Sequence, residues 1–135
     1  MAKTTGIAFT TLSVDDAAGT SRDLRNDFTS FNFATPRGVQ VVTGLDKSAE
    51  ERLLLLADFS ITINGVVNTS ANQSHDVFKT VPSSDVARTV SIGHSSVSLA
   101  NEVLFTDYRL NRPSSGELTF SAPGVLSDGT VPTWA

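Results

Sequence analysis

The two histidines are the side chains best suited to acid–base chemistry in this sequence. Asp76 follows His75, and Ser95 and Ser96 follow His94. Neighbouring residues on a helix or strand point in different directions, so His75 and Asp76 do not by themselves form a base with its orienting carboxylate. The Gly-x-Ser-x-Gly turn that presents a nucleophilic serine is absent. A small hydrolase that uses His75 or His94 is therefore the least favoured function.

Carboxylates show no catalytic spacing either. Asp15-Asp16 and Glu50-Glu51 are adjacent pairs that diverge on any regular element, whereas a glycosidase needs two carboxylates converging across one bond. Residues 127–130 predict a turn rather than a calcium loop. The chain has no cysteine, which excludes disulfides and thiolate metal sites. We expect no enzyme activity, no cofactor and no bound metal.

Length and composition indicate one mainly β domain. The chain has 135 residues, of which 39% are hydrophobic, only 18% are charged and 33 are Ser or Thr. Many hydroxyls with few charges are typical of strands rather than helices. Fourteen acidic against ten basic residues argue against broad binding of phosphates. We predict a single domain over 1–135 with a short N-terminal arm and a C-terminal arm over about 123–135, without a signal peptide or a membrane span.

Alternation of apolar and polar residues predicts about seven strands. In the clearest segment, 59–64, every second residue is apolar, and a similar alternation follows at 117–122. In segment 28–33 we expect Thr29, Phe31 and Phe33 to share one face. The predicted core consists of Phe59, Ile61, Ile63, Leu118 and Phe120.

Two segments carry helical signals. Residues 74–80 predict a short helix, with Ser74 as its cap and Pro82 ending it. Ser48 and Glu51 fit a capping box, which predicts one helical turn before the leucines at 53–56. Asn64-Gly65 fits either a hairpin turn or a bulge within one longer strand. The predicted fold is a β-sandwich or barrel with one short α-helix.

The order and spacing of several segments resemble the small major tail proteins, or tail tube subunits, of long-tailed bacteriophages. Residues 23–33 are similar to the segment that opens these proteins, 37–49 to the polar loop that follows, and 51–65 to the next strand. His75-Asp76-Val77-Phe78 lies where the single helix of the family falls. Residues 124–134 resemble the end of the shorter actinobacterial-virus members.

The resemblance implies a structural virion protein made in the host cytoplasm. It implies a β-sandwich subunit that forms hexameric rings, which stack into a tube for DNA ejection. Implied partners are further copies of the chain, the tape measure protein, the tail terminator and the distal tail proteins. DNA would pass through the lumen without specific binding.

Two sets of residues are candidates for contacts in such an assembly. Segment 34–47 has an apolar character that is unusual for a solvated loop, and we expect it to contact adjacent rings or subunits, although an ordinary strand pair with a turn explains it equally well. The candidate contact residues are Pro36, Arg37, Val39, Val41 and Val42. The candidate lumen-facing residues, polar positions opposite the core, are Asp107, Glu117 and Thr119. An acidic wall would weakly repel DNA, whereas the net charge could equally serve solubility alone.

The main alternative is another virion module of similar size, such as a head decoration or head–tail connector protein. Such a protein would also be β-rich and acidic. Purified tail tube subunits are expected to form stacked rings, whereas a decoration protein would remain monomeric or trimeric and bind capsids.

Overall fold

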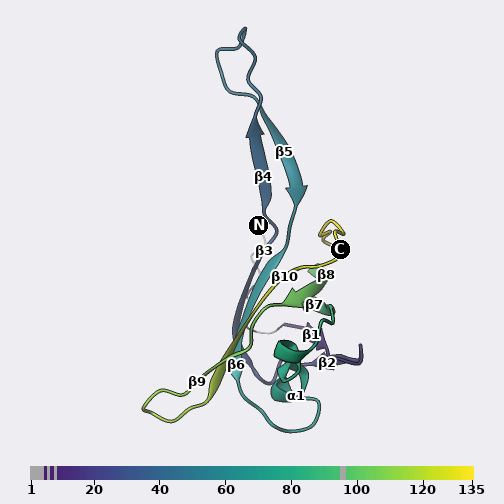
Figure 1. Ribbon diagram of the computed structural model, residues 1–135, viewed down its shortest axis with the longest axis vertical. Helices are drawn as coiled ribbons and strands as arrows, with labels where there is room; N and C mark the ends of the chain where they lie inside the picture. Colours follow the sequence, from purple (N-terminus) through teal and green to yellow (C-terminus); the bar gives the residue numbers. More distant parts are fainter. Residues whose placement is uncertain (1–4, 6, 8, 95–96) are drawn as a thin grey trace.

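The computed structural model describes residues 5, 7, 9–94 and 97–135 (Figure 1). An eight-stranded antiparallel sheet has the strand order β2-β1-β7-β8-β10-β6-β3, with β9 also paired to β10, and β4 and β5 form a separate two-stranded ribbon. The strands are β1 (Thr11–Asp15), β2 (Ser21–Asp23), β3 (Phe28–Ala34), β4 (Arg37–Val41), β5 (Arg52–Ala57), β6 (Ser60–Val66), β7 (Arg88–His94), β8 (Val97–Phe105), β9 (Arg109–Asn111) and β10 (Thr119–Leu126). The helices are α1 (Ser74–Phe78) and the 3-10 turn η1 (Val81–Ser83).

The main sheet is rolled, since the two strands at its opposite edges are joined by a short link and must therefore lie close together. β2 and β3 lie at opposite ends of the strand order, yet only residues 24–27 connect them. Across this seam, Phe9 packs edge-on against Phe31 of β3, with ring centroids 5.0 Å apart. Within the described residues β2 and β3 form no ladder with each other. The roll is therefore a barrel left open along one seam.

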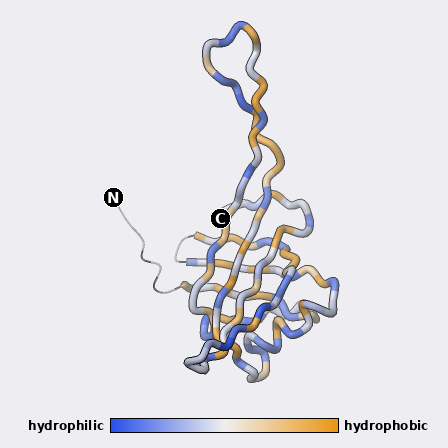
Figure 2. Tube along the Cα trace, turned by 60° about the vertical axis from the view of Figure 1, so that its left-hand side comes forward, coloured by the Kyte–Doolittle hydropathy of each residue, from blue (hydrophilic) through white to orange (hydrophobic). Residues whose placement is uncertain are grey.

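The β4–β5 ribbon continues two strands of the sheet outward. β3 leads into β4, and β5 returns into β6, so that the ribbon projects far beyond the rolled sheet (Figure 1). Hydrophobic residues continue along the ribbon after it has left the sheet (Figure 2). We call residues 37–57, comprising both strands and their connecting loop, the arm.

The core fills the inside of the roll with alternate residues of the strands, as the period of two predicts. Phe59, Ile61, Ile63 and Phe120 are buried, which confirms four of the five predicted core residues. Leu118 is 44% exposed, so its assignment to the core is wrong. It precedes β10, which begins at Thr119, and the alternation that buries Phe120 does not extend back to it.

Helix α1 confirms the predicted short helix and covers one end of the core. Phe78 is fully buried and contacts the rings of Phe105, Tyr108 and Phe120 at centroid distances of 5.1, 5.7 and 5.4 Å. Ser74 is not its cap, because Gln73 occupies that position. The Ser74 hydroxyl instead donates to the Val66 carbonyl at 2.9 Å and so fastens the helix to β6.

A buried carboxylate ties the seam to the helix. Asp27, in the link between β2 and β3, accepts hydrogen bonds from the Asn68 side chain and from the Ser74 backbone N–H, both at 2.9 Å. Because an unpaired buried carboxylate is costly, these donors fix where the link and the helix meet.

Arg88 at the start of β7 is also buried. Its guanidinium donates to the Asp15 carbonyl at 3.2 Å, to the Val77 carbonyl and to the Thr80 hydroxyl at 2.7 Å. Burial lowers the pKa of Arg88 below its ordinary value, while the nearby carboxylates of Asp16 and Asp15 act in the opposite direction. The side chain joins β1 to the end of α1.

Two local expectations are wrong: the shared face of segment 28–33 and the helical turn at 48–51. β3 shifts register between Phe28 and Ser30 and leaves Thr29 without a partner on β6, so Thr29 is exposed and does not continue the alternation of the half-buried Phe31 and Phe33. Phe28, before the shift, packs on Phe120. The expected helical turn at 48–51 is absent: β5 follows directly from the loop at the end of the arm. Asn64 and Gly65 lie inside β6, so they form no hairpin turn, and the alternative of one longer strand is the correct one. A Cβ at Gly65 would come within 2.4 Å of the Asp27 carbonyl oxygen, which explains the glycine.

The C-terminal segment differs from a simple arm. β10 includes residues 123–126, and only residues from 127 onward leave the sheet. Pro123 is tolerated because it sits where the neighbour of β10 changes from β9 to β8, so no ladder hydrogen bond is lost there. Ala135 and Ser98 exchange backbone hydrogen bonds at 2.9 and 3.2 Å. The expected N-terminal arm and the turn at 94–96 fall largely outside the described residues.

Candidate assembly surfaces

Exposed apolar side chains are concentrated in the arm. Eight of the 18 large hydrophobic residues that the structure shows as exposed lie there. They are Val39, Val41, Val42, Leu45, Leu53, Leu54, Leu55 and Leu56. Contiguous exposed apolar surface of this kind marks an interaction site in a folded protein.

The leucines of β5 are the residues that the sequence interpretation did not assign to a surface. Leu53, Leu54, Leu55 and Leu56 are 56, 61, 44 and 92% exposed. Four consecutive leucines in a strand point alternately to both faces, so a one-sided strand cannot bury them. The signal in the sequence was this unbroken apolar run next to a segment already suspected of being an interface.

The predicted contact residues of segment 34–47 lie at the base of the arm and along its first strand, β4. Val39 pairs with Leu54 and Val41 with Arg52 across the ribbon. Pro36 accepts a hydrogen bond from the Asp58 N–H at 3.0 Å where the arm begins, and Val42 donates its N–H to the Glu51 carbonyl at 2.9 Å just beyond β4. The segment is thus a strand of a projecting ribbon, with its side chains exposed.

Arg37 has a structural role in its own chain. The register of the ribbon shifts between Arg37 and Val39, where β5 contains one extra residue. Arg37 donates to the carbonyl oxygen of Leu55 within this bulge through Nε and Nη2, at 3.1 and 2.9 Å. Bulges bend a strand and increase its twist, so this contact helps set the direction of the arm.

The end of the arm is charged but balanced. Lys47 lies 3.8 Å from Asp46 and 4.0 Å from Glu51, and Arg52 pairs with Glu50. All of these side chains are well exposed, and exposed ion pairs contribute little to stability. The charges keep the loop at the tip solvated, while the apolar residues lie mainly along the strands.

The three predicted lumen residues meet at a second projection, the β9–β10 hairpin (Figure 1). Thr119 pairs with Asn111 across this hairpin, Glu117 lies in its loop, and Asp107 lies two residues before β9 begins. A hydrogen bond from the Arg109 side chain lowers the pKa of Asp107, and one from the Ser115 side chain lowers the pKa of Glu117.

The hairpin is nevertheless not an acidic surface. Arg109 Nε lies 2.7 Å from Asp107 Oδ2, and Arg112 lies in the same loop as Glu117. Two basic residues therefore accompany the two carboxylates. The local charge is balanced rather than repulsive toward a phosphate backbone.

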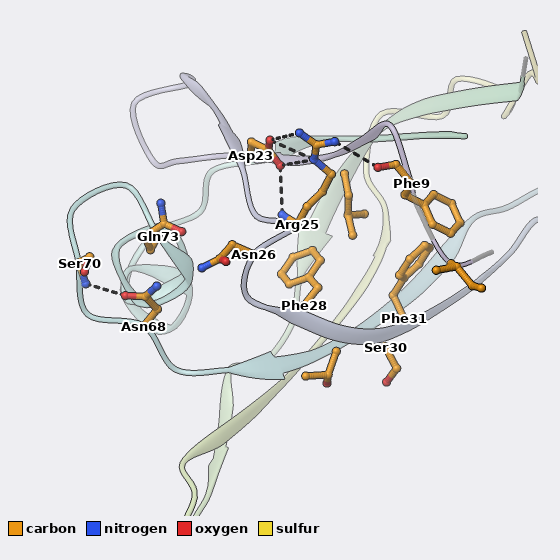
Figure 3. Close-up of a pocket in the computed structure, with 13 residues that line it drawn as sticks. Phe9, Asp23, Arg25, Asn26, Phe28, Ser30, Phe31, Asn68, Ser70 and Gln73 are labelled. Carbon is orange, nitrogen blue, oxygen red and sulfur yellow. Dashed lines mark hydrogen bonds and ion pairs between the residues drawn. The ribbon is translucent and has the colours of Figure 1, made fainter. Parts of the chain in front are cut away.

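A groove of about 1140 Å³ lies along the open seam of the roll (Figure 3). Phe28 and Phe31 of β3 form part of its wall, and Arg25 spans its rim by pairing with Asp23 at 2.8 Å and donating to the Phe9 carbonyl at 3.2 Å. The outer edge of β3 has no strand partner within the described residues. The lining of the groove mixes aromatic with polar and charged side chains, and an unpaired strand edge beside it is a site for strand pairing.

The histidines do not assemble a catalytic group. His75 Nδ1 lies 3.1 Å from the Tyr108 hydroxyl, and burial raises the pKa of that hydroxyl. His94 packs edge-on against Phe9, with ring centroids 5.0 Å apart. Neither ring contacts a carboxylate among the described residues, and in that part of the chain no three potential metal ligands cluster. No helix in the described part is long and apolar enough to cross a membrane.

Comparison with known proteins gives a likeness of fold. No protein-family model matches the chain, and no curated protein matches its sequence. A chain from the structure "Virion of native gene transfer agent (GTA) particle" superposes with a TM-score of 0.72 at 11% identity, over 98% of this chain and 99% of that one. A chain from "Tail of empty GTA particle computed with helical refinement, C6 symmetry" gives 0.73 at 14% identity, with the same coverage.

These likenesses extend over nearly the whole length of both chains, so they include the arm as well as the rolled sheet. The predicted fold class, mainly β of the tail tube type with one short α-helix, is confirmed. The chain has the fold of a subunit found in a sixfold-symmetric tail.

Proposed function

We propose that this protein is a structural subunit of a virion tail, which forms hexameric rings that stack into a tube. The observation that carries the proposal is the fold shared with a chain of a C6-symmetric tail, over 98% of this chain. The arm supports it independently, because an exposed apolar ribbon needs a partner in the assembled state.

In this proposal Val39, Val41 and Val42 of the arm contact neighbouring copies, while Pro36 and Arg37 hold its base. Fully burying a valine or leucine side chain contributes about 1.5–3 kcal/mol, so burial of these half-exposed residues in every subunit favours a repeated contact. The tube would serve as a conduit for DNA, and the tape measure, tail terminator and distal tail proteins would be its partners.

Asp107, Glu117 and Thr119 remain the proposed lumen positions. The ion pair between Asp107 and Arg109 changes what they would do there. Because the hairpin is close to neutral, it would not hold DNA through counterion release, nor repel it strongly. A conduit requires only that its wall be weakly interacting.

The test is negative-stain electron microscopy of the purified protein over a range of concentrations, with light scattering to count subunits. Sixfold rings and tubes are the expected products. Monomers or trimers at every concentration would refute the proposal and favour the alternative of a head decoration or head–tail connector protein, which binding to capsids would then establish.

A further inference from the structure

Both faces of the arm carry exposed apolar side chains. Val39 and its cross-strand partner Leu54 lie on one face, together with Val41 two residues along β4; these three residues are the valine face, which Arg52, the partner of Val41, borders toward the tip. Leu53 pairs with Gln40 on the opposite face.

Leu55 lies on the same face as Leu53. A Cβ built on Gly38 would meet Leu55 Cδ1 at 3.2 Å, so the Leu55 side chain covers Gly38, and Gly38 points away from the valine face. Leu53 and Leu55 together form the leucine face. All five residues of the two faces are exposed in the isolated subunit.

A single partner surface that packs against one face of a two-stranded ribbon leaves the other face in water. A two-stranded ribbon is only marginally stable alone in water, and a strand that is apolar on both faces is typical of a position between two layers. If a single neighbour covered the arm, two leucines or two valines with Leu54 would remain in water on the other side. The side-chain pattern therefore fits an arm held between two surfaces.

Two different copies of this chain can supply those surfaces. This step rests on the proposed function. The tail that shares the fold has sixfold symmetry and was refined as a helix, so each subunit there has neighbours around the axis and other neighbours along it. Both contacts are heterologous, which means that each joins two different patches of the same chain.

We infer that the arm is inserted between two copies of the chain, with the valine face on one and the leucine face on the other. One of the faces then closes rings, and the other joins rings into a tube. Neighbouring residues in the sequence, Leu53 and Leu54, serve separate interfaces.

Paired substitutions test this separation. Val39→Ser with Leu54→Ser removes the valine face, and Leu53→Ser with Leu55→Ser removes the leucine face. Isoleucine at the same positions is the matched control, because it keeps both apolarity and β-propensity. Circular dichroism and thermal unfolding verify that each variant is folded before its assembly is followed by electron microscopy and light scattering.

The expected result is that the two serine pairs stop at different products: one gives closed rings that do not stack, and the other gives no closed rings. The isoleucine pairs assemble like the wild type. If both serine pairs stop at the same product, or if either assembles normally, the inference is wrong. A wild-type chain that forms no rings would instead refute the proposed function itself.

A labelling measurement gives an answer even if a serine pair misfolds. The chain has no cysteine, so Leu53→Cys and Leu54→Cys each introduce one thiol. Both thiols should react with a maleimide in dilute subunits and lose that reactivity in tubes. A thiol at either position that reacts equally well before and after assembly would contradict burial of both faces.

Discussion

The guanidinium group of Arg37 and the carbonyl oxygen of Leu55 form a two-pronged hydrogen bond, at 3.1 and 2.9 Å, at the point where the arm leaves the sheet. The bulge interrupts the regular ladder there, and Arg37 satisfies the carbonyl. Both residues are exposed, so the bond directs the arm more than it stabilises the core.

Arg37→Lys keeps the charge but loses the planar fork. We expect the free energy of unfolding to change by less than about 0.5 kcal/mol, because the site is exposed. Tube elongation, followed by light scattering, should slow because the arm is less well oriented. Arg112→Lys, at an exposed position outside the arm, is the control. Elongation at the wild-type rate would show that Arg37 does not orient the arm.

Charges on the valine face should block elongation without unfolding the subunit. In Val39→Asp with Val41→Asp, assembly would bury two charges, and the carboxylate at position 39, opposite Leu54, would have no cationic partner, which is strongly unfavourable. The thermal unfolding midpoint of the dilute subunit should stay close to that of the wild type, while tubes disappear from electron micrographs. Normal tubes would exclude this face from any interface.

Ile61 and Leu118 offer a matched comparison of core and surface. Ile61 is 2% exposed, so Ile61→Ala should lower the free energy of unfolding by about 2–5 kcal/mol. Leu118→Ala should cost less than about 1 kcal/mol in the dilute subunit, because the side chain is already largely solvated. Urea unfolding at low protein concentration measures both. Equal costs would contradict the assignment of the core.

Asp16 should make stability depend on pH at the acid end. It accepts hydrogen bonds from the N–H groups of Thr20 and Ala18 and from the Arg22 side chain, and these contacts, the Thr20 bond foremost, lower its pKa in the folded state. Its contribution is therefore complete above the unfolded pKa of about 3.9, and is lost as the pH falls through the lower folded value.

Thermal unfolding of the wild type and of Asp16→Asn, measured from about pH 6 downward, tests this linkage. The wild type should be the more stable at pH 6, and the difference should shrink below about pH 4. A difference that does not vary with pH would show that the charge of Asp16 contributes nothing to the turn.

The sequence predicts the core well where period-two alternation is unbroken. Ile61 and Ile63 follow that rule because β6 is paired on both sides along its length. The alternation breaks between Phe28 and Ser30, because a bulge there adds one residue to β3, and nothing in the residue types indicates that bulge. The rule fails at Leu118 because an apolar residue in a loop looks the same as one in the adjoining strand.

The candidate surfaces were harder to predict, and for a different reason. Segment 34–47 could be singled out because valines in a Gly- and Pro-containing loop are unusual. The leucines of β5 gave no comparable indication of a surface, because leucine is usually buried. In our proposal other copies of the chain cover them, and the pattern of one sequence does not specify such a contact. The bond between Arg37 and Leu55 depends on a register shift that no local pattern specifies.

The arm also has a consequence for the folding pathway. Ala34 pairs with Ser60, so 25 intervening residues must be looped out before β3 and β6 can meet. Loop closure becomes costlier with length, by about 0.6 kcal/mol for each doubling. If β4 and β5 zip together first, they shorten that loop and bring the sheet strands into register. The segment that we propose for contacts between molecules would then also influence how quickly each molecule reaches its native topology.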